Sequence, residues 1–445
     1  MHRWRRALIT ALALAGALAG SAVPAAEPPA AALPRIVVAF ANEPASAPGP
    51  AGSTGHRYAG GAYGVSQSAA LTARHVASDY GLREVASWPI RELAMHCVVY
   101  EIVGGRPSGE VLAALARDPR VALAQPLNEF HTLSAPTLPS AAAPPATPPA
   151  ARAPTAAPAY DDPLYDLQTN LPALGVPEAH RRAQGAGIRI ALIDTAVDAQ
   201  HPDLAGRIVR SRSFVGANRG AGDSQRHGTA MAGIIAAVAG NGIGIVGIAP
   251  RAELEVYAAC WQLAPDRDDA ACNTFTLARA LAAALESGAP LVNVSVAGPE
   301  DALLTALIAT GVRRGVIFVG ATTDAGGGFP AGVAGVLGAA GSEAGVVPPG
   351  ALAAPARHVL TLRPGAQYDF ESGTSVSAAE ITGVIALLMS ATRARLPADA
   401  IRALLQPPST PVVAGGPVTA VNAAAALARL DSSQQRTAGH ALDGL

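Results

Sequence analysis

The alternation of short apolar runs with helix-like stretches is the sequence feature that most restricts the fold of this 445-residue chain. Four runs read as buried strands, at residues 187–194, 253–259, 290–296 and 316–321. Helix-like stretches separate them at 229–240, 275–288 and 301–315, and another apolar helix begins near Ser375. This alternation is typical of a parallel sheet with helices on both faces. We therefore predict an α/β domain whose functional groups collect beyond the carboxyl ends of its strands.

A segment rich in Pro, Ala, Ser and Thr, residues 135–159, divides the chain. Such a composition cannot bury a core, so we interpret the segment as an extended linker. Before it, residues 27–134 predict a small α+β domain of the order strand, helix, strand, helix, strand, at 35–40, 66–82, 97–102, 108–118 and 121–127. After it, residues 160–430 form the α/β domain and residues 431–445 form a C-terminal tail.

The first residues indicate export. Three arginines precede an apolar run at 7–23, and Pro24-Ala25-Ala26 follows it, which is the pattern of a secretory signal peptide over residues 1–26. A membrane anchor is the alternative, but the run is short and rich in Ala and Gly. Charged residues make up only 15% of the chain and the net charge is −1, so neither nucleic acid nor an anionic membrane is an expected partner. We expect a secreted or periplasmic protein.

Three cysteines are present. Export permits a disulfide, and Cys260 and Cys272 bracket a polar loop that such a bond could close. Spacing alone does not prove this pairing. Cys97 would remain as a buried thiol on a strand-like segment.

Three residues stand where catalytic groups are often found. Asp194 ends a strand, and His227 and Ser375 each open a helix. Each also fits as a helix or turn cap, so local propensity does not separate the two interpretations. A serine hydroxyl becomes a nucleophile when an imidazole takes its proton and a carboxylate orients that imidazole. Together the three residues would supply all of these groups.

The segments around these residues resemble the motifs of the subtilisin-like serine proteases. Residues 193–198 with 201–204 (IDTAVD, HPDL) resemble the aspartate motif, and residues 227–233 (HGTAMAG) resemble the histidine motif. Gly373-Thr374-Ser375 resembles the serine motif, and the order Asp, His, Ser is also that of the subtilisins. The resemblance covers roughly residues 161–430. It implies a subtilisin-like parallel sheet, preceded by a small α+β propeptide domain that inhibits the enzyme until it is cut away. The linker is the expected place of that cut.

The resemblance also implies roles for individual residues. Asp194 would orient His227, which acts as general base and then general acid, while Ser375 attacks the peptide carbonyl. Six further residues would contact the substrate: Ser295, Val296 and Ala297 by pairing with its backbone, and Gly320, Ala321 and Thr322 by lining the primary side-chain pocket.

The chain departs from the family's usual residues beside this site. Ala196 and Ala297 stand where Gly is usual, and Ala379-Glu380 stands where Pro-His is usual. Where an Asn usually donates to the oxyanion, an ungapped alignment places Asp324, and a slip of one residue places Thr323.

Two functions follow from these observations. The first is a secreted serine endopeptidase, made as a zymogen, that hydrolyses peptide bonds through an acyl-enzyme. The alternative is a degenerate subtilisin-like protein that binds peptides with weak or no turnover because the oxyanion Asn is replaced. An esterase of the other Ser-His-Asp fold would need a Gly-x-Ser-x-Gly elbow, which Ser375 lacks.

The expected partners are polypeptide substrates and the chain's own propeptide, and we expect a monomer. The chemistry requires no cofactor. The resemblance makes structural calcium possible, but we assign no ligands to it. His201 fits a structural role in its turn better than metal ligation, because no spaced cluster of His, Asp or Glu supports a metal site.

Overall fold

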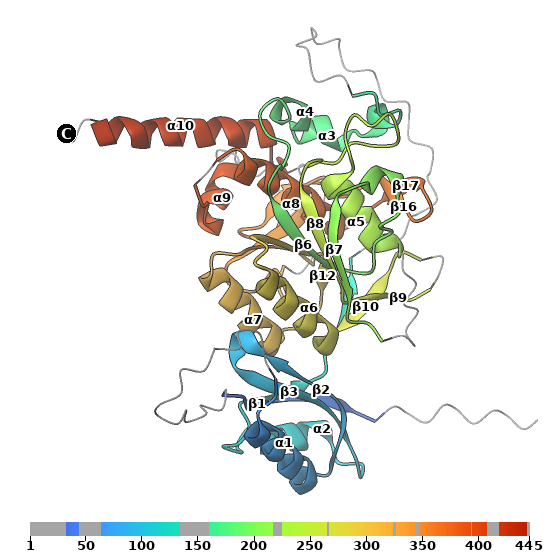
Figure 1. Cartoon of the computed structure of the whole chain (residues 1–445), viewed down its shortest axis with the longest axis vertical. Coiled ribbons are helices and arrows are strands. Elements are labelled where there is room, and N and C mark those ends of the chain that lie inside the picture. Colours follow the sequence, from blue (N-terminus) through green and yellow to red (C-terminus); the bar gives the residue numbers. More distant parts are fainter. Residues whose placement is uncertain are drawn as a thin grey trace, which may run out of the picture.

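The structure is a computed structural model that describes residues 33–43, 64–133, 160–216, 225–264, 267–323, 326–343, 347–392, 394–406 and 418–442. The predicted signal peptide, the predicted linker and Asp324 lie outside the described residues. A smaller domain lies below a larger one in Figure 1.

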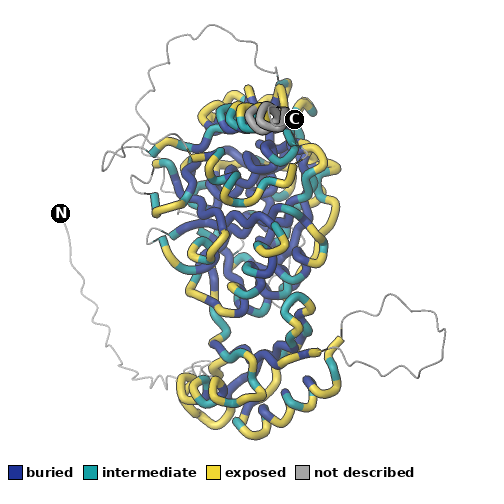
Figure 2. Tube along the Cα trace, turned by 90° about the vertical axis from the view of Figure 1, so that its left-hand side faces the viewer, coloured by how far each residue is buried: buried dark blue, intermediate teal, exposed yellow. Residues whose placement is uncertain are grey.

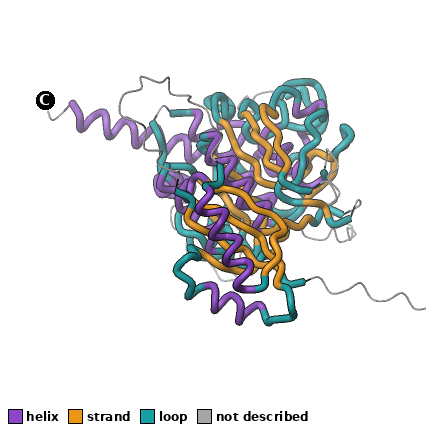
Figure 3. Tube along the Cα trace, turned by 60° about the horizontal axis from the view of Figure 1, so that its bottom comes forward, coloured by secondary structure: helices purple, strands orange, loops and turns teal. Residues whose placement is uncertain are grey.

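The small domain is a four-stranded antiparallel sheet covered on one face by two helices. Its elements are β1 (Arg35–Ala41), α1 (Gln67–Tyr80), β2 (Leu82–Ile90), β3 (Met95–Ile102), α2 (Ser108–Leu115) and β4 (Leu123–Pro126), with sheet order β2-β3-β1-β4. α1 begins where the Ser66 side chain accepts from the Ala69 N–H, and it ends at Gly81, whose φ of 67° favours glycine. Both helices lie on the face that points away from the larger domain (Figures 1 and 3). This arrangement agrees with the predicted α+β class.

β2 is absent from the predicted order of elements. The strand lies at the edge of its sheet and contains Pro89, which an edge strand tolerates because one N–H row is unpaired. Its register against β3 shifts between Glu84 and Ala86. Such an irregularity breaks the two-residue alternation by which strands are recognised in a sequence.

The large domain contains the predicted parallel sheet. Its seven strands are β6 (Arg189–Asp194), β7 (Ile208–Ser213), β8 (Glu253–Ala258), β11 (Leu291–Val294), β13 (Ile317–Ala321), β14 (Val336–Gly341) and β15 (Leu352–Ala354), in the order β15-β14-β13-β11-β6-β8-β7. All neighbouring strands in it are parallel. The run predicted as one strand at 290–296 is divided, because β12 (Val296–Ala297) leaves this sheet after β11.

Helices cover both faces of the parallel sheet, and β6 shows why. Ile190 and Leu192 of β6 belong to the apolar core on one face, and Ala191 and Ile193 belong to the core on the other. The first core contains residues of α3 (Asn170–Ala173), α4 (Val176–Ala179), α5 (Arg226–Ala236), α8 (Thr374–Ser390), α9 (Ala398–Leu405) and α10 (Ala423–Leu442). The second contains residues of α6 (Thr274–Ser287) and α7 (Ala302–Arg313). Figure 2 shows this buried interior as the dark blue part of the large domain.

Two smaller features complete the large domain. A hairpin of β16 (Val359–Arg363) and β17 (Gln367–Glu371) leads into α8. α10 extends through most of residues 431–445, the range predicted as a tail.

A second sheet joins the two domains. It contains β5 (Glu129–Thr132), which follows the small domain, with β9 (Trp261–Gln262), β10 (Ala270–Asn273) and β12 of the large domain. Its order is β12-β5-β10-β9, so β5 lies between two strands of the large domain. The Trp88 ring of β2 also packs edge-on against Phe275 of α6, with ring centroids 4.8 Å apart.

Candidate active site

Asp194 and His227 are in direct contact at the carboxyl end of β6. Nδ1 of His227 lies 2.8 and 3.0 Å from the two carboxylate oxygens of Asp194. Both side chains are buried. The sequence brings them together through Gly228, because a Cβ at this position would lie 2.6 Å from the Thr195 carbonyl oxygen. α5 can therefore begin close against the end of β6.

The surroundings of His227 favour its protonated form. Burial is the largest single effect and disfavours the charged imidazolium, but the charge and hydrogen bond of Asp194, together with the charges of Glu371 and Asp268, outweigh it. The pKa of His227 therefore lies above its usual value.

Ser375 lies in the first turn of α8, which packs against α5. The preceding Gly373 has φ 133°, a conformation that a residue with a side chain rarely adopts. The Ser375 hydroxyl donates to the Ser295 carbonyl oxygen at 2.9 Å and accepts from the Leu133 N–H at 3.1 Å. Among the described residues, Nε2 of His227 has no hydrogen-bond partner. The hydroxyl is thus turned toward Ser295, which lies between β11 and β12.

β5 occupies the groove between β12 and β10. Thr132 pairs with Val296 and His131 with Ala297, both antiparallel. On the other edge of β5, Phe130 pairs with Cys272. Ser295, Val296 and Ala297 therefore lie along an extended segment of the chain itself, as a substrate-pairing strand would lie along a peptide.

Gly320, Ala321 and Thr322 lie at the carboxyl end of β13. Gly320 has no room for a side chain, because a Cβ would lie 2.5 Å from Cγ of Pro330. The carbonyl of Thr322 accepts from the Thr374 hydroxyl at 2.8 Å. This bond fixes the end of β13 next to the start of α8.

Thr323, one of the two oxyanion candidates, is at the edge of the described chain. Its hydroxyl makes a long contact of 3.5 Å with the Gly327 carbonyl. Asp324, the other candidate, lies outside the described residues.

Two acidic residues that the sequence analysis did not single out, Glu371 and Asp268, act electrostatically on His227 and belong to a network of ion pairs. Arg363 donates to both carboxylate oxygens of Asp268 and lies 3.3 Å from a Glu371 oxygen. Nε of Arg226, the residue before His227, lies 3.0 Å from Asp268. These residues come from three separate segments and carry no motif, so only the fold brings them together.

The structure pairs Cys260 with Cys272, as expected, and Cys97 is buried and free. The disulfide closes the loop that contains Asp268. Asp268 is therefore held both by a covalent loop and by Arg363.

His201 has the structural environment predicted for it. Its Nδ1 accepts from the Asp203 N–H at 3.2 Å, and its Nε2 lies 3.2 Å from the Gln367 carbonyl oxygen. No group of three or more His, Cys, Asp or Glu within the described parts of the chain could hold a metal. The buried carboxylate of Asp203 accepts from Asn241, Ile245 and Tyr368.

Comparisons with known proteins agree with this architecture. The subtilase family matches residues 185–421. Thermitase of Thermoactinomyces vulgaris is 29% identical over 263 residues, which is 55% of this chain and 90% of thermitase. The intracellular serine protease of Paenibacillus polymyxa is 27% identical over 257 residues, 53% of this chain and 76% of the relative.

A solved structure extends the likeness in fold. Fervidolysin from Fervidobacterium pennivorans, a keratinolytic enzyme related to subtilisin, superimposes with a TM-score of 0.63 and 19% identity. The match covers 89% of this chain and 61% of fervidolysin. The chain belongs to the subtilase family and is a subtilisin-like serine endopeptidase. Within its described part, no helix is both long and apolar enough to cross a bilayer.

Proposed function

We propose that this chain is an exported serine endopeptidase, made as an inactive precursor, in which Asp194, His227 and Ser375 form the catalytic triad. Nε2 of His227 takes the Ser375 proton while Oγ bonds to the peptide carbonyl carbon. The tetrahedral intermediate then expels the amine, which receives the proton from His227. Water then hydrolyses the acyl-enzyme by the same steps. Its proton goes to His227 while its oxygen bonds to the acyl carbon, and the second tetrahedral intermediate expels Ser375, which takes the proton back from His227.

The negative oxygen of the intermediate needs donors aimed at it. The start of α8 is one source, because free backbone N–H groups at a helix N-terminus favour negative charge. Thr323 or Asp324 would supply the side-chain donor. An Asp can donate only when protonated, so a site that uses Asp324 would be weak near neutral pH.

The observation that carries the precursor proposal is the position of β5. Residues 129–132 are paired on both edges with strands of the large domain, and the next residue, Leu133, donates to the proposed nucleophile. The small domain thus blocks the groove in the manner of an inhibitory propeptide. The rotation of the Ser375 hydroxyl onto Ser295 and the unpaired Nε2 of His227 fit a resting precursor.

The strand geometry supports one bond as the site of the proposed cut. In an extended strand, the N–H and C=O of one residue point to the same edge, and those of its neighbour point to the opposite edge. The Leu133 N–H points to Ser375, so the Leu133 carbonyl lies on the edge of the nucleophile while that of Thr132 faces β10. We assign the self-processing cut to the bond between Leu133 and Ser134.

Expression of the full-length chain tests this assignment. N-terminal sequencing of the product should give Ser134 as the first residue, followed by trimming within the linker. Ser375→Ala should accumulate uncut, with turnover reduced on the order of 10⁶-fold. Ser377→Ala is the matched control, since Ser377 lies in the same helix and its hydroxyl donates to the Ala354 and Pro355 carbonyls. A first cut elsewhere, or processing by Ser375→Ala, would contradict the proposal.

Export rests on the sequence pattern of residues 1–26 and on the disulfide between Cys260 and Cys272, because disulfides persist in oxidising compartments. Fractionation of the native host should recover the processed enzyme outside the cytoplasm. Recovery in the cytoplasm would contradict export while leaving the catalytic proposal intact.

A further inference from the structure

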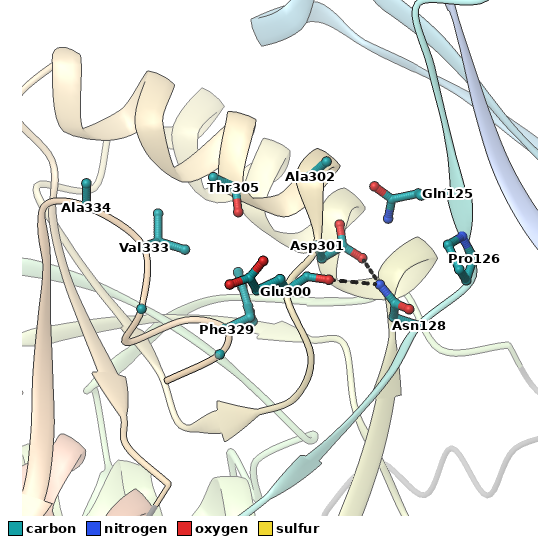
Figure 4. Close-up of a pocket in the computed structure, with 12 residues that line it drawn as sticks. Gln125, Pro126, Asn128, Glu300, Asp301, Ala302, Thr305, Phe329, Val333 and Ala334 are labelled. Carbon is teal, nitrogen blue, oxygen red and sulfur yellow. Dashed lines mark hydrogen bonds between the residues drawn. The ribbon is translucent and has the colours of Figure 1, made fainter. Parts of the chain in front are cut away.

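Asn128, just before β5, forms hydrogen bonds with the large domain through its backbone and through its side chain. Its backbone N–H donates to the Thr274 hydroxyl, and its carbonyl accepts from the Thr274 N–H, both at 3.0 Å. Its side-chain amide donates to Asp301 at 3.0 Å and to the Glu300 carbonyl at 3.3 Å. Figure 4 shows the amide pointing at both acceptors.

The groups that receive Asn128 are buried and fixed in place. Thr274 and Asp301 are 0% and 2% exposed. One oxygen of Asp301 caps α7 by accepting from the Leu304 N–H at 3.0 Å. The other accepts from the Thr274 hydroxyl at 2.7 Å and from Asn128. The site is therefore formed by the starts of two helices, α6 and α7, and its oxygen acceptors converge on Asn128.

The receiving groups belong to the large domain, whereas Asn128 belongs to the segment that the proposed processing releases. A cavity of about 610 Å³ continues beyond Asn128, lined by Glu300, Thr305, Phe329 and Val333 among others. A side chain longer than Asn has space there. After processing, this acceptor set would face any peptide that replaces β5 in the groove.

We propose that Thr274, Glu300 and Asp301 form a specificity subsite for the sixth residue before the scissile bond, counting Leu133 as the first. The subsite selects a side chain that donates N–H groups, an amide or a cation, and rejects a carboxylate. The reason is that the groups meeting the side chain of this residue, the Asp301 carboxylate and the Glu300 carbonyl, are acceptors, and a second carboxylate would meet that of Asp301 without a donor between them. The inference rests on the proposed function, since it places a substrate where β5 lies.

Peptides test the subsite on the processed enzyme obtained from the full-length chain. The parent peptide carries residues 128–139, with the bond after Leu133 in its middle. Asn128→Leu keeps the shape and removes the donor, and it should lower kcat/KM about tenfold or more, the scale of a hydrogen bond to a charged group. Asn128→Asp should lower it further, and Asn128→Arg should be cut at least as well as the parent.

Glu129→Gln is the matched control peptide, because the Glu129 side chain is 61% exposed and contacts His131 of its own strand. It should be cut like the parent. If the parent peptide and all variants resist cleavage, the proposed function fails. If all are cut with equal kcat/KM, the endopeptidase stands and the subsite is overturned.

A change in the enzyme separates recognition from a structural effect. Asp301→Asn keeps the cap on α7, because Asn is as good a helix cap as Asp, but it offers an amide to the sixth residue. The preference should then invert, with the Asn128→Asp peptide cut better than the parent. A purely structural role for Asp301 would lower kcat/KM equally for every peptide, and that result would overturn the inference.

Discussion

At the scale of single residues, the electrostatics of His227 matter most. A base must be neutral to accept a proton, and the pKa of His227 is raised by Asp194, Glu371 and Asp268. The raised pKa moves the lower pH limit of activity upward. Glu371 and Asp268 thus narrow the pH range in which the proposed triad can act.

Asp268→Asn should move the acid limb of the pH profile of kcat/KM to lower pH. The change removes a negative charge that favours the imidazolium, so His227 stays neutral, and active, in more acidic solution. Turnover of a peptide substrate measured from acid to neutral pH checks this. Asp269→Asn, one residue away and with its carboxylate paired with Arg267, is the control and should leave the limb in place. A shift toward higher pH would contradict the prediction.

At the scale of single elements, α8 contains a buried acid that the chemistry does not use. Glu380 is 0% exposed and accepts from the Asn170 amide of α3 at 2.8 Å. The second oxygen of Glu380 and the amide oxygen of Asn170 have no partner within the described structure. Burial raises the pKa of Glu380 well above its usual value, although the Asn170 amide opposes it. A proton on Glu380 would satisfy the unpaired oxygens.

Glu380→Gln should stabilise the enzyme at neutral and alkaline pH. Because the folded pKa of Glu380 is raised, the folded state binds a proton that the unfolded state has lost, and stability falls as pH rises from the unfolded pKa toward the folded one. Gln keeps the acceptor and adds a permanent donor. The gain should be about 1–3 kcal/mol, the cost of a buried unsatisfied group, and should vanish near pH 4.

Thermal unfolding against pH measures this gain, in a Ser375→Ala background that prevents self-digestion. Asp399→Asn, at the exposed start of α9, is the control and should leave the melting curve unchanged. An equal melting temperature for Glu380→Gln and the parent at pH 8 would contradict the prediction.

The elements that the sequence predicts well are those whose secondary structure is determined by their own residues. β6, β8, β11 and β13 are short, mainly apolar runs, so their burial could be predicted from their residues. The edge strand β7 (IVRSRS) and the small-residue strand β14 (VLGAAG) carry no comparable signal. β5 is short and polar, and its partners are more than one hundred residues away in the sequence.

The same division holds for the candidate site. The motif resemblance anticipated the contact between Asp194 and His227, because the residues that position them are adjacent in the sequence. The pairing of Cys260 with Cys272 was anticipated from the loop that they flank. Arg363 and Asp268, which are 95 residues apart, could not be paired from the sequence, since neither segment specifies the other.

At the scale of the whole molecule, the two domains are joined by an aromatic anchor. Phe130 of β5 is fully buried, with its ring centroid 5.2 Å from that of Phe329. Gly298 makes the room for it, because a Cβ there would lie 2.3 Å from the Phe130 ring. The anchor fixes the fourth residue before the proposed cut.

Phe130→Ala should loosen the cut small domain from the enzyme by on the order of 10²-fold, the scale of an emptied aromatic site. The recovery of peptidase activity after dilution of freshly processed enzyme measures its release. His131→Ala is the control, since its side chain is 53% exposed on the same strand. Equal recovery for Phe130→Ala and the parent would show that Phe130 is no anchor.

The position of β5 also limits which proteins such an enzyme can digest. β12 and β10 bond to β5 and not to each other, so the groove between them is one strand wide. A substrate chain can fill the groove only when about six consecutive residues adopt an extended conformation, a length of roughly 20 Å. Helices and closed hairpins do not enter. The bonds that reach Ser375 would therefore lie in loops or unfolded segments that can become extended, and not inside helices or sheets.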